Sequence, residues 1–346
     1  MKRILTSLAL CASSLFADAP SSPPPAGAKT PSREITPCAG PRVTAGWDMF
    51  ITADFIYWTT RVDGLGSVMS GFNPSSGSGS GKVFNPNWQW NPGFKVGIGN
   101  NLWHDGWDTF LDFTWIESHA SRAAEDLTLF PMWNIANQYI TPTTGLVFAS
   151  DVDWSFWMNW FDLELGRNCF LSEYLKLRPF MGLKIAFGMQ KYQLQYTRQI
   201  DINFQAKDTM SNNFHYFGIG PRAGLNSAWQ FSEAWSLYGD FALSLLWSQF
   251  RAQRRDEART MPFSQNPGVF GLRTKNQVNT CKPVLELGLG LRWETWFSED
   301  DYHFLIQAGW EEQIWISYNQ ILKLNEEAAH GDLITQGLTV HFRFDF

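Results

Sequence analysis

The sequence predicts an all-β protein, a transmembrane antiparallel up-and-down β-barrel of about 10 strands. Three observations predict it: a last strand in which apolar and polar residues alternate strictly, an excess of tryptophan, and connections that alternate between short and long. Bacterial outer-membrane barrels have this pattern. Their outer face meets lipid, their inner face is polar, and short periplasmic turns alternate with long extracellular loops.

The last segment, residues 337–346, carries the clearest alternation. Side chains in a strand point to opposite faces at every second residue. One face is apolar throughout and consists of Leu338, Val340, Phe342, Phe344 and Phe346. The other face consists of Thr339, His341, Arg343 and Asp345. We expect this strand to close the barrel, with its apolar face toward lipid.

Composition excludes two other classes of protein. Apolar residues make up 44% of the chain, but beyond the amino terminus no apolar run approaches the roughly 18 residues that a membrane-spanning helix needs. The 18 tryptophans are more than a soluble core of this size needs, and they suit the two aromatic girdles of a membrane barrel. A formal charge of −6 argues against a nucleic-acid partner.

The amino-terminal part of the chain is expected to precede the barrel. Residues 1–17 begin with Lys2 and Arg3 after the initiating methionine, continue with a short apolar stretch and end at Ala17, as in a secretory signal peptide. Residues 18–45 are rich in Pro, Ser and Ala and are predicted to be a disordered periplasmic leader. Residues 46–346 then form one domain, the barrel.

The mature chain keeps three cysteines, Cys38, Cys169 and Cys281, in an oxidising compartment. An odd number means that at least one is free, is paired between molecules or is bound to another group. We expect Cys169 in a periplasmic turn and Cys281 beside a surface loop. These two cysteines then lie on opposite sides of the membrane and do not pair.

Ten segments show the alternation of spanning strands, each of about 9–11 residues or somewhat longer. They are residues 46–59, 93–100, 107–116, 154–165, 175–187, 214–226, 235–248, 284–296, 302–314 and 333–346. The fourth is aromatic on both faces, so its register stays open. The predicted periplasmic girdle is Trp103, Trp107, Trp229, Trp235, Trp293 and Trp296, and the predicted outer girdle is Trp58, Trp115, Trp154, Trp247 and Trp315.

The connections between these segments alternate in length. Short connections are expected at residues 101–106, 167–174, 227–234 and 297–301, and long ones at residues 60–92, 117–153, 188–213, 249–283 and 317–332. The second long connection has room for two more strands, near residues 127–133 and 145–150, so that a barrel of 12 strands is the alternative. The rival fold is a soluble antiparallel barrel or sandwich. The signal peptide, the tryptophans, the loop alternation and Phe346 together favour the membrane barrel.

Several segments resemble the Legionella-type major outer membrane protein family. They read ADFIYW at residues 53–58, RVDGL at 61–65, LRPFMGLK at 177–184 and GIGPRAGL at 218–225. This family includes major-outer-membrane-protein-like porins of chlamydia-like bacteria, so the resemblance implies a pore-forming, surface-exposed barrel with no catalytic residues to carry over. Three mature cysteines do not match the disulfide network of chlamydial porins. Resemblance to outer-membrane proteins also implies that the insertion machinery reads a carboxy-terminal signal, Val340, Phe342, Phe344 and Phe346.

Charged residues on the polar faces of the strands are the candidate pore lining. They are Asp48, Asp54, Lys95, Asp108, Asp112, Lys176, Arg178, Lys184, Arg222, Asp240, Glu286, Arg292, Glu294, Glu311 and Arg343. Buried charges must be paired or hydrated, so the lumen is either a hydrophilic channel or a closed interior laced with ion pairs. A barrel of about 10 strands lies near the closed end of the known sizes. The family resemblance favours the channel, and a slight excess of acids suggests mild cation preference.

Two other functions stay open as alternatives. A hydrolase is the less favoured one, because the histidines have no metal-ligand spacing and no Gly-x-Ser-x-Gly motif occurs. His119 after Glu117 is the least implausible general base, and such a residue is more often a solvated loop histidine. No cofactor and no metal are expected. A surface adhesin or structural protein is the other. Arg251, Arg254, Arg255 and Arg259, among Asp256 and Glu257, are placed to hold lipopolysaccharide phosphates or to be a solvated loop.

The sequence therefore predicts an outer-membrane, porin-like protein for passive diffusion of small hydrophilic solutes. The expected partners are outer-membrane lipid, lipopolysaccharide, the insertion machinery and a host surface. Pore radius, solute, ion selectivity and oligomeric state stay undetermined at this level.

Overall fold

The structure is a computed structural model and describes residues 39–41, 43, 46–73, 78–102, 105–135, 147–201, 204–261, 270–322 and 331–346. The chain divides into Met1–Ile35 and Thr36–Phe346, and every described residue belongs to the second unit. The predicted signal peptide and most of the predicted leader lie outside the described residues. No helix in the described ranges is long and apolar enough to cross a membrane.

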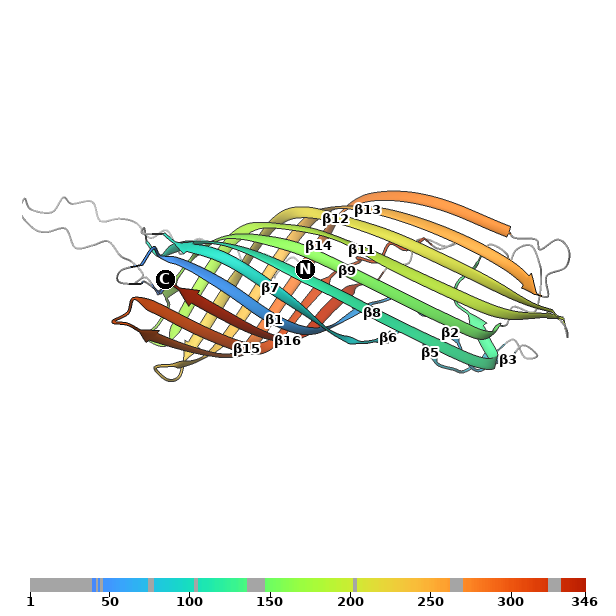
Figure 1. The fold of residues 1–346 in the computed structure, drawn as a ribbon, viewed down its shortest axis with the longest axis horizontal. Helices are drawn as coiled ribbons and strands as arrows, with labels where there is room; N and C mark the ends of the chain where they lie inside the picture. Colours follow the sequence, from blue (N-terminus) through green and yellow to red (C-terminus); the bar gives the residue numbers. More distant parts are fainter. Residues whose placement is uncertain are drawn as a thin grey trace, which may run out of the picture. The chain divides into compact units, whose positions relative to one another are not determined.

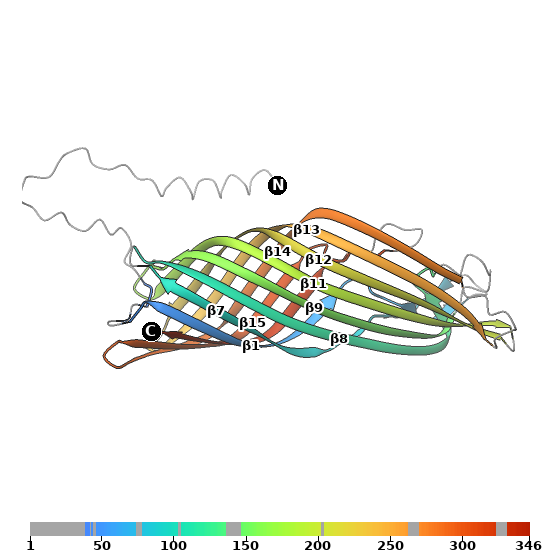
Figure 2. The same cartoon turned by 45° about the horizontal axis from the view of Figure 1, so that its top comes forward.

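Ten long antiparallel strands form a closed barrel (Figures 1 and 2). In order around the barrel they are β1 (Met49–Val62), β7 (Trp90–Asn101), β8 (Trp107–Pro131), β9 (Val147–Arg167), β11 (Leu175–Asp201), β12 (Phe204–Gln230), β13 (Trp235–Met261), β14 (Phe270–Phe297), β15 (Tyr302–Trp315) and β16 (Leu333–Asp345). The last strand pairs with the first, for example Phe55 with Val340, so no edge is left open. The predicted fold class and strand number are confirmed.

The alternative of 12 strands is wrong. Residues 127–131 continue β8 and residues 147–150 begin β9, and the two pair with each other, as Leu129 does with Val147. Six further strands of two residues each are not part of the barrel wall's ten strands. In the connection between β1 and β7 they are β2 (Val68–Met69), β3 (Phe72–Asn73), β4 (Ser78–Gly79), β5 (Val83–Phe84) and β6 (Asn87–Trp88), and before β11 there is β10 (Cys169–Phe170).

Three of the five predicted long loops are mostly strand. β11 and β12 stay paired from Gly188 and Tyr216 out to Asp201 and Phe204, through the described part of the segment expected to be a loop. The strands β8, β9 and β11–β14 have 21–28 residues, about twice the length predicted. At about 3.3 Å per residue, the longest strands extend about 90 Å, far more than a tilted crossing of the membrane requires. We call the barrel end with the short connections the turn end and the other the loop end.

The outward faces of the strands are continuously apolar only over the half nearer the turn end. On β13 the outward side chains run from Trp235 through Leu237, Phe241, Leu243 and Leu245 to Trp247, and all are exposed. Beyond Trp247 the outward positions from Gln249 to Glu257 are polar. This apolar stretch covers about 40 Å of strand, or about 30 Å along the axis at the usual tilt, which matches the hydrocarbon core. We call it the apolar band, and the polar continuation of the strands the extension.

Aromatic side chains mark the boundary between the apolar band and the extension. Trp90 lies between Tyr57 and Trp310, with both ring centroids at 5.8 Å, and Trp115 stacks on Phe94. Trp247 also lies at this level. Of the predicted outer girdle, Trp115 and Trp247 therefore face outward, but Trp58, Trp154 and Trp315 are buried inside the barrel, at no more than 1% exposure. At the turn end, Trp229 and Trp235 face outward as predicted, whereas Trp296 lies against buried His303 and lines the lumen.

The seam between β16 and β1 ends on the carboxy-terminal residue. The Phe346 amide donates to the Met49 carbonyl oxygen at 3.0 Å, and the Phe346 carbonyl oxygen accepts from the amides of Trp47 and Met49. The rings of Phe344 and Phe346 stack at 6.0 Å. The last aromatic residue thus takes part in closing the barrel, while its role as an assembly signal stays a prediction.

The position of the apolar band predicts where an outward charge is costly. Leu289 on β14 is 59% exposed in the middle of the band. We expect Leu289→Arg to lower the free energy of unfolding by about 2–4 kcal/mol, the cost of arginine at the bilayer midplane. Gln193→Arg is the matched control, because Gln193 is exposed on the extension of β11 and meets water. Urea refolding titrations in lipid vesicles compare the two, and equal losses would place the band wrongly.

Candidate functional site: the lumen

The lumen within the apolar band is a charged chamber with a cavity of about 450 Å³. Fourteen of the fifteen predicted lumen residues are on inward-facing strand positions, and Asp48 is the exception. Twelve of them line the cavity: Asp54, Lys95, Asp112, Lys176, Arg178, Arg222, Asp240, Glu286, Arg292, Glu294, Glu311 and Arg343. Asp48, Asp108 and Lys184 do not line it; Asp48 lies before β1 and is buried, and the other two are engaged in ion pairs. Whether these residues line a conducting pore stays a prediction.

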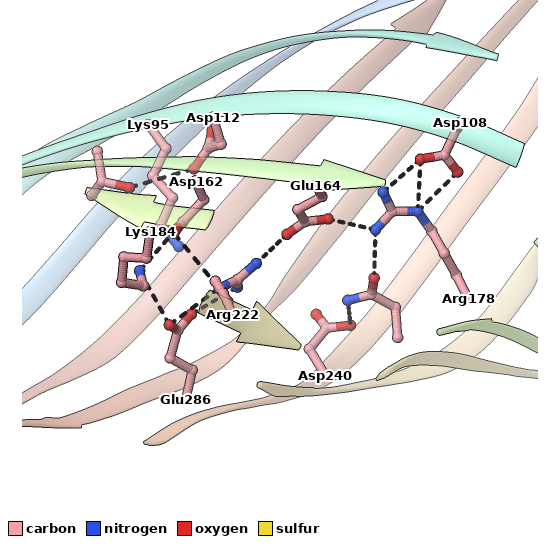
Figure 3. A network of polar contacts seen from close by, with 12 residues as sticks. Lys95, Asp108, Asp112, Asp162, Glu164, Arg178, Lys184, Arg222, Asp240 and Glu286 are labelled. Carbon is pink, nitrogen blue, oxygen red and sulfur yellow. Dashed lines mark hydrogen bonds and ion pairs between the residues drawn. The ribbon is translucent and has the colours of Figure 1, made fainter. Parts of the chain in front are cut away.

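A continuous chain of ion pairs crosses the chamber (Figure 3). The Lys184 ammonium lies 2.9 Å from Asp162 and 3.1 Å from Glu286. Arg222 contacts Glu286 at 2.8 Å and also pairs with Glu164. These five residues come from β9, β11, β12 and β14, so the chain ties a wide arc of the barrel wall together.

The chain continues toward the turn end through Arg178. Its guanidinium lies 2.6 Å from Glu164 and 2.6 Å from Asp108, and it donates to the amide oxygen of Asn226 at 2.9 Å. Asn226 in turn donates to Asp240 at 2.8 Å. Charged groups in a low dielectric are stable only with such partners, so the network satisfies the charges that the lumen buries.

Separate pairs hold the opposite wall and the rim. Lys95 on β7 reaches Glu311 on β15 at 2.6 Å, across β1 and β16. At the turn end, Lys176 pairs with Glu294 at 3.1 Å. Asp345 pairs with His303 at 2.7 Å and with Arg343 at 2.6 Å.

Two acids differ from the rest. Among the described residues, neither Asp112 nor Asp240 has a basic side chain in ion-pair distance; Asp112 accepts from Thr114 and Asp240 accepts from Asn226. Both face the cavity. No described basic side chain compensates either carboxyl group directly.

An aromatic layer closes the lumen directly above the charged chamber. Trp160 on β9 and Trp315 on β15 have ring centroids 6.0 Å apart, although these strands are five places apart among the ten and therefore opposite each other. Both rings are 1% exposed. Trp58 on β1 stacks on Trp160 at 6.4 Å, and Tyr216 on β12 meets Trp315 at 6.1 Å. Rings from four sides of the barrel thus meet at its axis.

Two lysines join the chamber to the aromatic layer. The Lys184 ammonium lies 5.3 Å from the ring centre of Trp160 and 5.8 Å from that of Trp315, and Lys95 lies 5.0 Å from that of Trp58. These are cation–π distances. Each lysine therefore has carboxylates on one side and indole faces on the other, which fixes the height at which the lumen changes from charged to apolar.

Connections from the loop end fold into the lumen above this layer. The β15–β16 connection inserts Tyr318, which packs on Tyr216 at 5.0 Å and Phe214 at 5.6 Å. Burial raises the pKa of the Tyr318 phenol above its ordinary value, so it stays neutral. The β1–β7 connection is held by Tyr192, whose hydroxyl donates to the Leu65 carbonyl oxygen at 3.1 Å.

Arg254 fastens two of these connections and is not the loop residue that the sequence suggested. It points inward, is 2% exposed, and donates to Asp256 at 2.8 Å. It also donates to the Leu322 carbonyl oxygen at 2.9 Å and to the Asn134 carbonyl oxygen. The expected contact of Arg254 with lipopolysaccharide is therefore wrong, because its side chain does not reach the outside.

The end of the predicted leader lies at the turn-end mouth of the chamber. The Ala39 amide donates to the Asn168 carbonyl oxygen, and the Asn101 side chain donates to the Pro41 carbonyl oxygen at 3.2 Å. Residues 39–41 also line the cavity.

Sequence reasoning missed part of the lumen. Asp162 and Glu164 lie two residues apart on β9, so they share a face and both enter the ion-pair chain. Their i, i+2 spacing could have indicated a shared inward face. Aromatic residues on both faces of β9 left the parity of this strand open in the sequence. No local signal marks the aromatic layer, because its rings meet across the barrel axis.

The other candidate groups make no site. His119 contacts Glu117 at 3.2 Å on the exposed outward face of β8, and no described hydrogen bond or ion pair adds a third side chain to this pair. Within the described ranges no cluster of His, Cys, Asp and Glu is arranged to hold a metal ion. Cys169 in β10 and Cys281 on β14 form no disulfide. In the β13–β14 sheet register Cys281 lies opposite Trp247, at the boundary between the apolar band and the extension. Cys38, Trp103, His104 and His330 lie outside the described residues.

A closed ten-stranded barrel with an apolar band and a charged lumen defines the class of outer-membrane β-barrels. The chain belongs to the family described as the Legionella pneumophila major outer membrane protein precursor, whose family model matches residues 39–346. The resemblance and the predicted outer-membrane location are thereby confirmed, and the turn end is the periplasmic end.

Solved structures to which this chain is similar include the following three, all at low identity. Outer membrane protease OmpT from Escherichia coli has 10% identity and a TM-score of 0.41, covering 86% of this chain and 96% of that one. The toluene transporter TodX of Pseudomonas putida has 8% identity and a TM-score of 0.30, covering 86% and 90%. A major outer membrane protein from Thermus thermophilus has 11% identity and a TM-score of 0.27, covering 86% and 99%. No curated protein matches the chain.

The ion-pair chain predicts a large cost for removing one of its cations. Lys184 is 0% exposed between two carboxylates. We expect Lys184→Met to lower the free energy of unfolding by about 3–5 kcal/mol, because it leaves buried charge less compensated. Arg167→Met is the control: it breaks the pair with Asp105, which is partly exposed, and is expected to cost about 1 kcal/mol or less. Denaturant titration in detergent measures both, and a Lys184→Met loss as small as that of the control would contradict the structural role.

Proposed function

We propose that the protein is a pore-forming outer-membrane protein through which small hydrophilic solutes diffuse passively, and that the aromatic layer gates this pore. The charged chamber is the conducting part. The layer is the barrier that a solute must pass, and conduction occurs when its rings separate.

One observation carries the proposal: a cavity of about 450 Å³ is lined by charged side chains, and Lys95 and Lys184 at this charged chamber contact the indoles of Trp58 and Trp160, which belong to the rings that meet across the barrel. A charged cavity in an otherwise sealed interior is costly to maintain, because every polar group in it must be paired or hydrated. A route for water and solutes gives such a cavity a use. The parts that fill the lumen above the layer, such as Tyr318, belong partly to connections and not to the wall.

The second candidate is a permanently closed barrel with a structural or surface role. The aromatic layer favours it, because the rings of Trp160 and Trp315 are fully buried in this conformation. An enzyme is the least supported reading. His119 and Glu117 lie on the outward face, and no described hydrogen bond joins a serine or cysteine side chain to them.

Removal of the layer is expected to open the pore. Trp160→Ala combined with Trp315→Ala deletes the two rings that meet from opposite strands, so we expect frequent, long-lived conductance steps where the wild type gives rare, brief ones. Planar-bilayer recordings of purified protein measure this. Trp229→Ala with Trp235→Ala removes as many indoles from the lipid-facing side and is expected to leave the wild-type pattern unchanged.

The outcome distinguishes the two candidates. If neither the wild type nor the layer variant conducts above protein-free bilayers, while both remain folded, the barrel is not a pore and the closed surface protein takes its place.

The charges that line the cavity predict its ion preference. Eight acidic and six basic side chains line it, so cations are expected to be mildly favoured. Asp112→Asn with Asp240→Asn removes two acids that make no described ion pair, which leaves the network of Figure 3 otherwise intact. In a salt gradient the reversal potential of the conducting layer variant should shift toward anion preference when these two changes are added. An unchanged potential would mean that the selective step lies elsewhere.

A further inference from the structure

The outward face of the extension is divided into two flanks of opposite charge. On β13 and β14 the exposed outward positions include Arg251, Arg255, Arg273 and Lys275, which we call the basic patch. On β8 and β9 the exposed outward positions include Glu117, Glu125, Asp151 and Asp153, which we call the acidic flank. Figure 2 shows these strands running out together beyond the middle of the barrel.

The basic patch is internally repulsive. Arg255 lies directly opposite Arg273 in the β13–β14 register, and Lys275 lies opposite Gln253, one outward position away. Like charges directly opposite on a sheet destabilise it. Among the described residues only Arg255 has an acidic partner, Glu257, whereas Arg251, Arg273 and Lys275 make no ion pair within that part of the chain. The patch therefore presents at least three exposed cations without described partners.

The patch also lies at a defined height. Arg251 follows Trp247, at the boundary of the apolar band, by four residues on the same strand. At about 3.3 Å per residue and a tilt of about 40°, Arg251 is about 10 Å and Arg255 about 20 Å above the boundary. This layer, just outside the hydrocarbon on the extracellular side, is where the phosphate groups of the outer leaflet lie.

We propose that the basic patch binds the phosphate groups of lipopolysaccharide. Guanidinium groups form paired, charge-assisted hydrogen bonds with phosphate oxygens, and Lys275 adds a point charge. Bound phosphates also relieve the repulsion between Arg255 and Arg273. The acidic flank lies over the same range of strand positions and repels the same ligand, so lipopolysaccharide is held on one side of the barrel. This interaction is independent of conduction and of the lumen.

The test uses the full-length, folded protein in a zwitterionic detergent with fluorescently labelled lipopolysaccharide. The patch variant combines Arg251→Gln, Arg273→Gln and Lys275→Gln; these side chains are exposed and make no described ion pair, so folding is expected to persist, as checked by heat-modifiable gel mobility. The matched control combines Glu117→Gln, Asp151→Asn and Asp153→Asn on the acidic flank. We expect the patch variant to bind at least tenfold more weakly at about 0.15 M salt, since each basic residue near an anionic surface contributes to binding. The control should bind as tightly as the wild type or more tightly.

The remaining comparisons identify the ligand and the alternatives. Enzymatically dephosphorylated lipopolysaccharide should bind the wild type as weakly as the intact form binds the patch variant. Equal binding of the two forms by the wild type, equal binding by the wild type and the patch variant, or an equal loss in the acidic-flank control would each overturn the proposal. A patch variant that retains lipopolysaccharide but changes oligomeric state in native mass spectrometry would assign the patch to a second copy of this chain instead.

Discussion

The position of the water–hydrocarbon boundary along each strand is the constraint on which the rest of this structure depends. The hydrocarbon core is about 30 Å thick, but the longest strands have up to 28 residues and cross it with only about half their length. Where a strand leaves the hydrocarbon, the side chains on its outward face must change from apolar to polar. On β11 the outward residues are apolar up to Phe187 and Met189 and become polar at the next outward positions, Lys191 and Gln193.

The inward faces exchange their chemistry at the same height and in the opposite sense. Within the apolar band the interior is charged, as Asp162 and Glu164 on β9 show. Toward the loop end the same face of β9 carries the aromatic residues Trp160, Phe156 and Trp154. The extension is therefore built like a water-soluble barrel, with the packed apolar core that a barrel of this height needs outside the lipid. Lys95 and Lys184 lie at the level where the charged chamber meets the aromatic layer, because an ammonium group interacts favourably with both a carboxylate and an indole face. The outward and inward faces thus change polarity at the same height and in opposite senses. One interior can therefore hold a charged chamber, in which ion pairs between strands satisfy the charges, and a packed apolar core above it.

The sequence by itself predicted about ten strands in up-and-down order and the parity of every strand except residues 154–165, because a period of two is a local property of a strand. The fourteen inward charges on the strands and the lipid-facing leucines such as Leu289 followed from that parity. The extension of β11 and β12 was mistaken for a loop, since its outward face is polar and its apolar face points inward, the reverse of what a membrane strand shows. Trp58, Trp154 and Trp315 were misplaced for the same reason.

Only the tertiary structure decided which side chains meet across the barrel. Trp160 and Trp315 are 155 residues apart in the chain and lie on opposite strands, and Arg178 finds Asp108 from 70 residues away. Such contacts depend on how the ten strands are staggered when the sheet closes, which no short segment encodes. Parity therefore tells which residues face inward, and closure alone tells which of them touch.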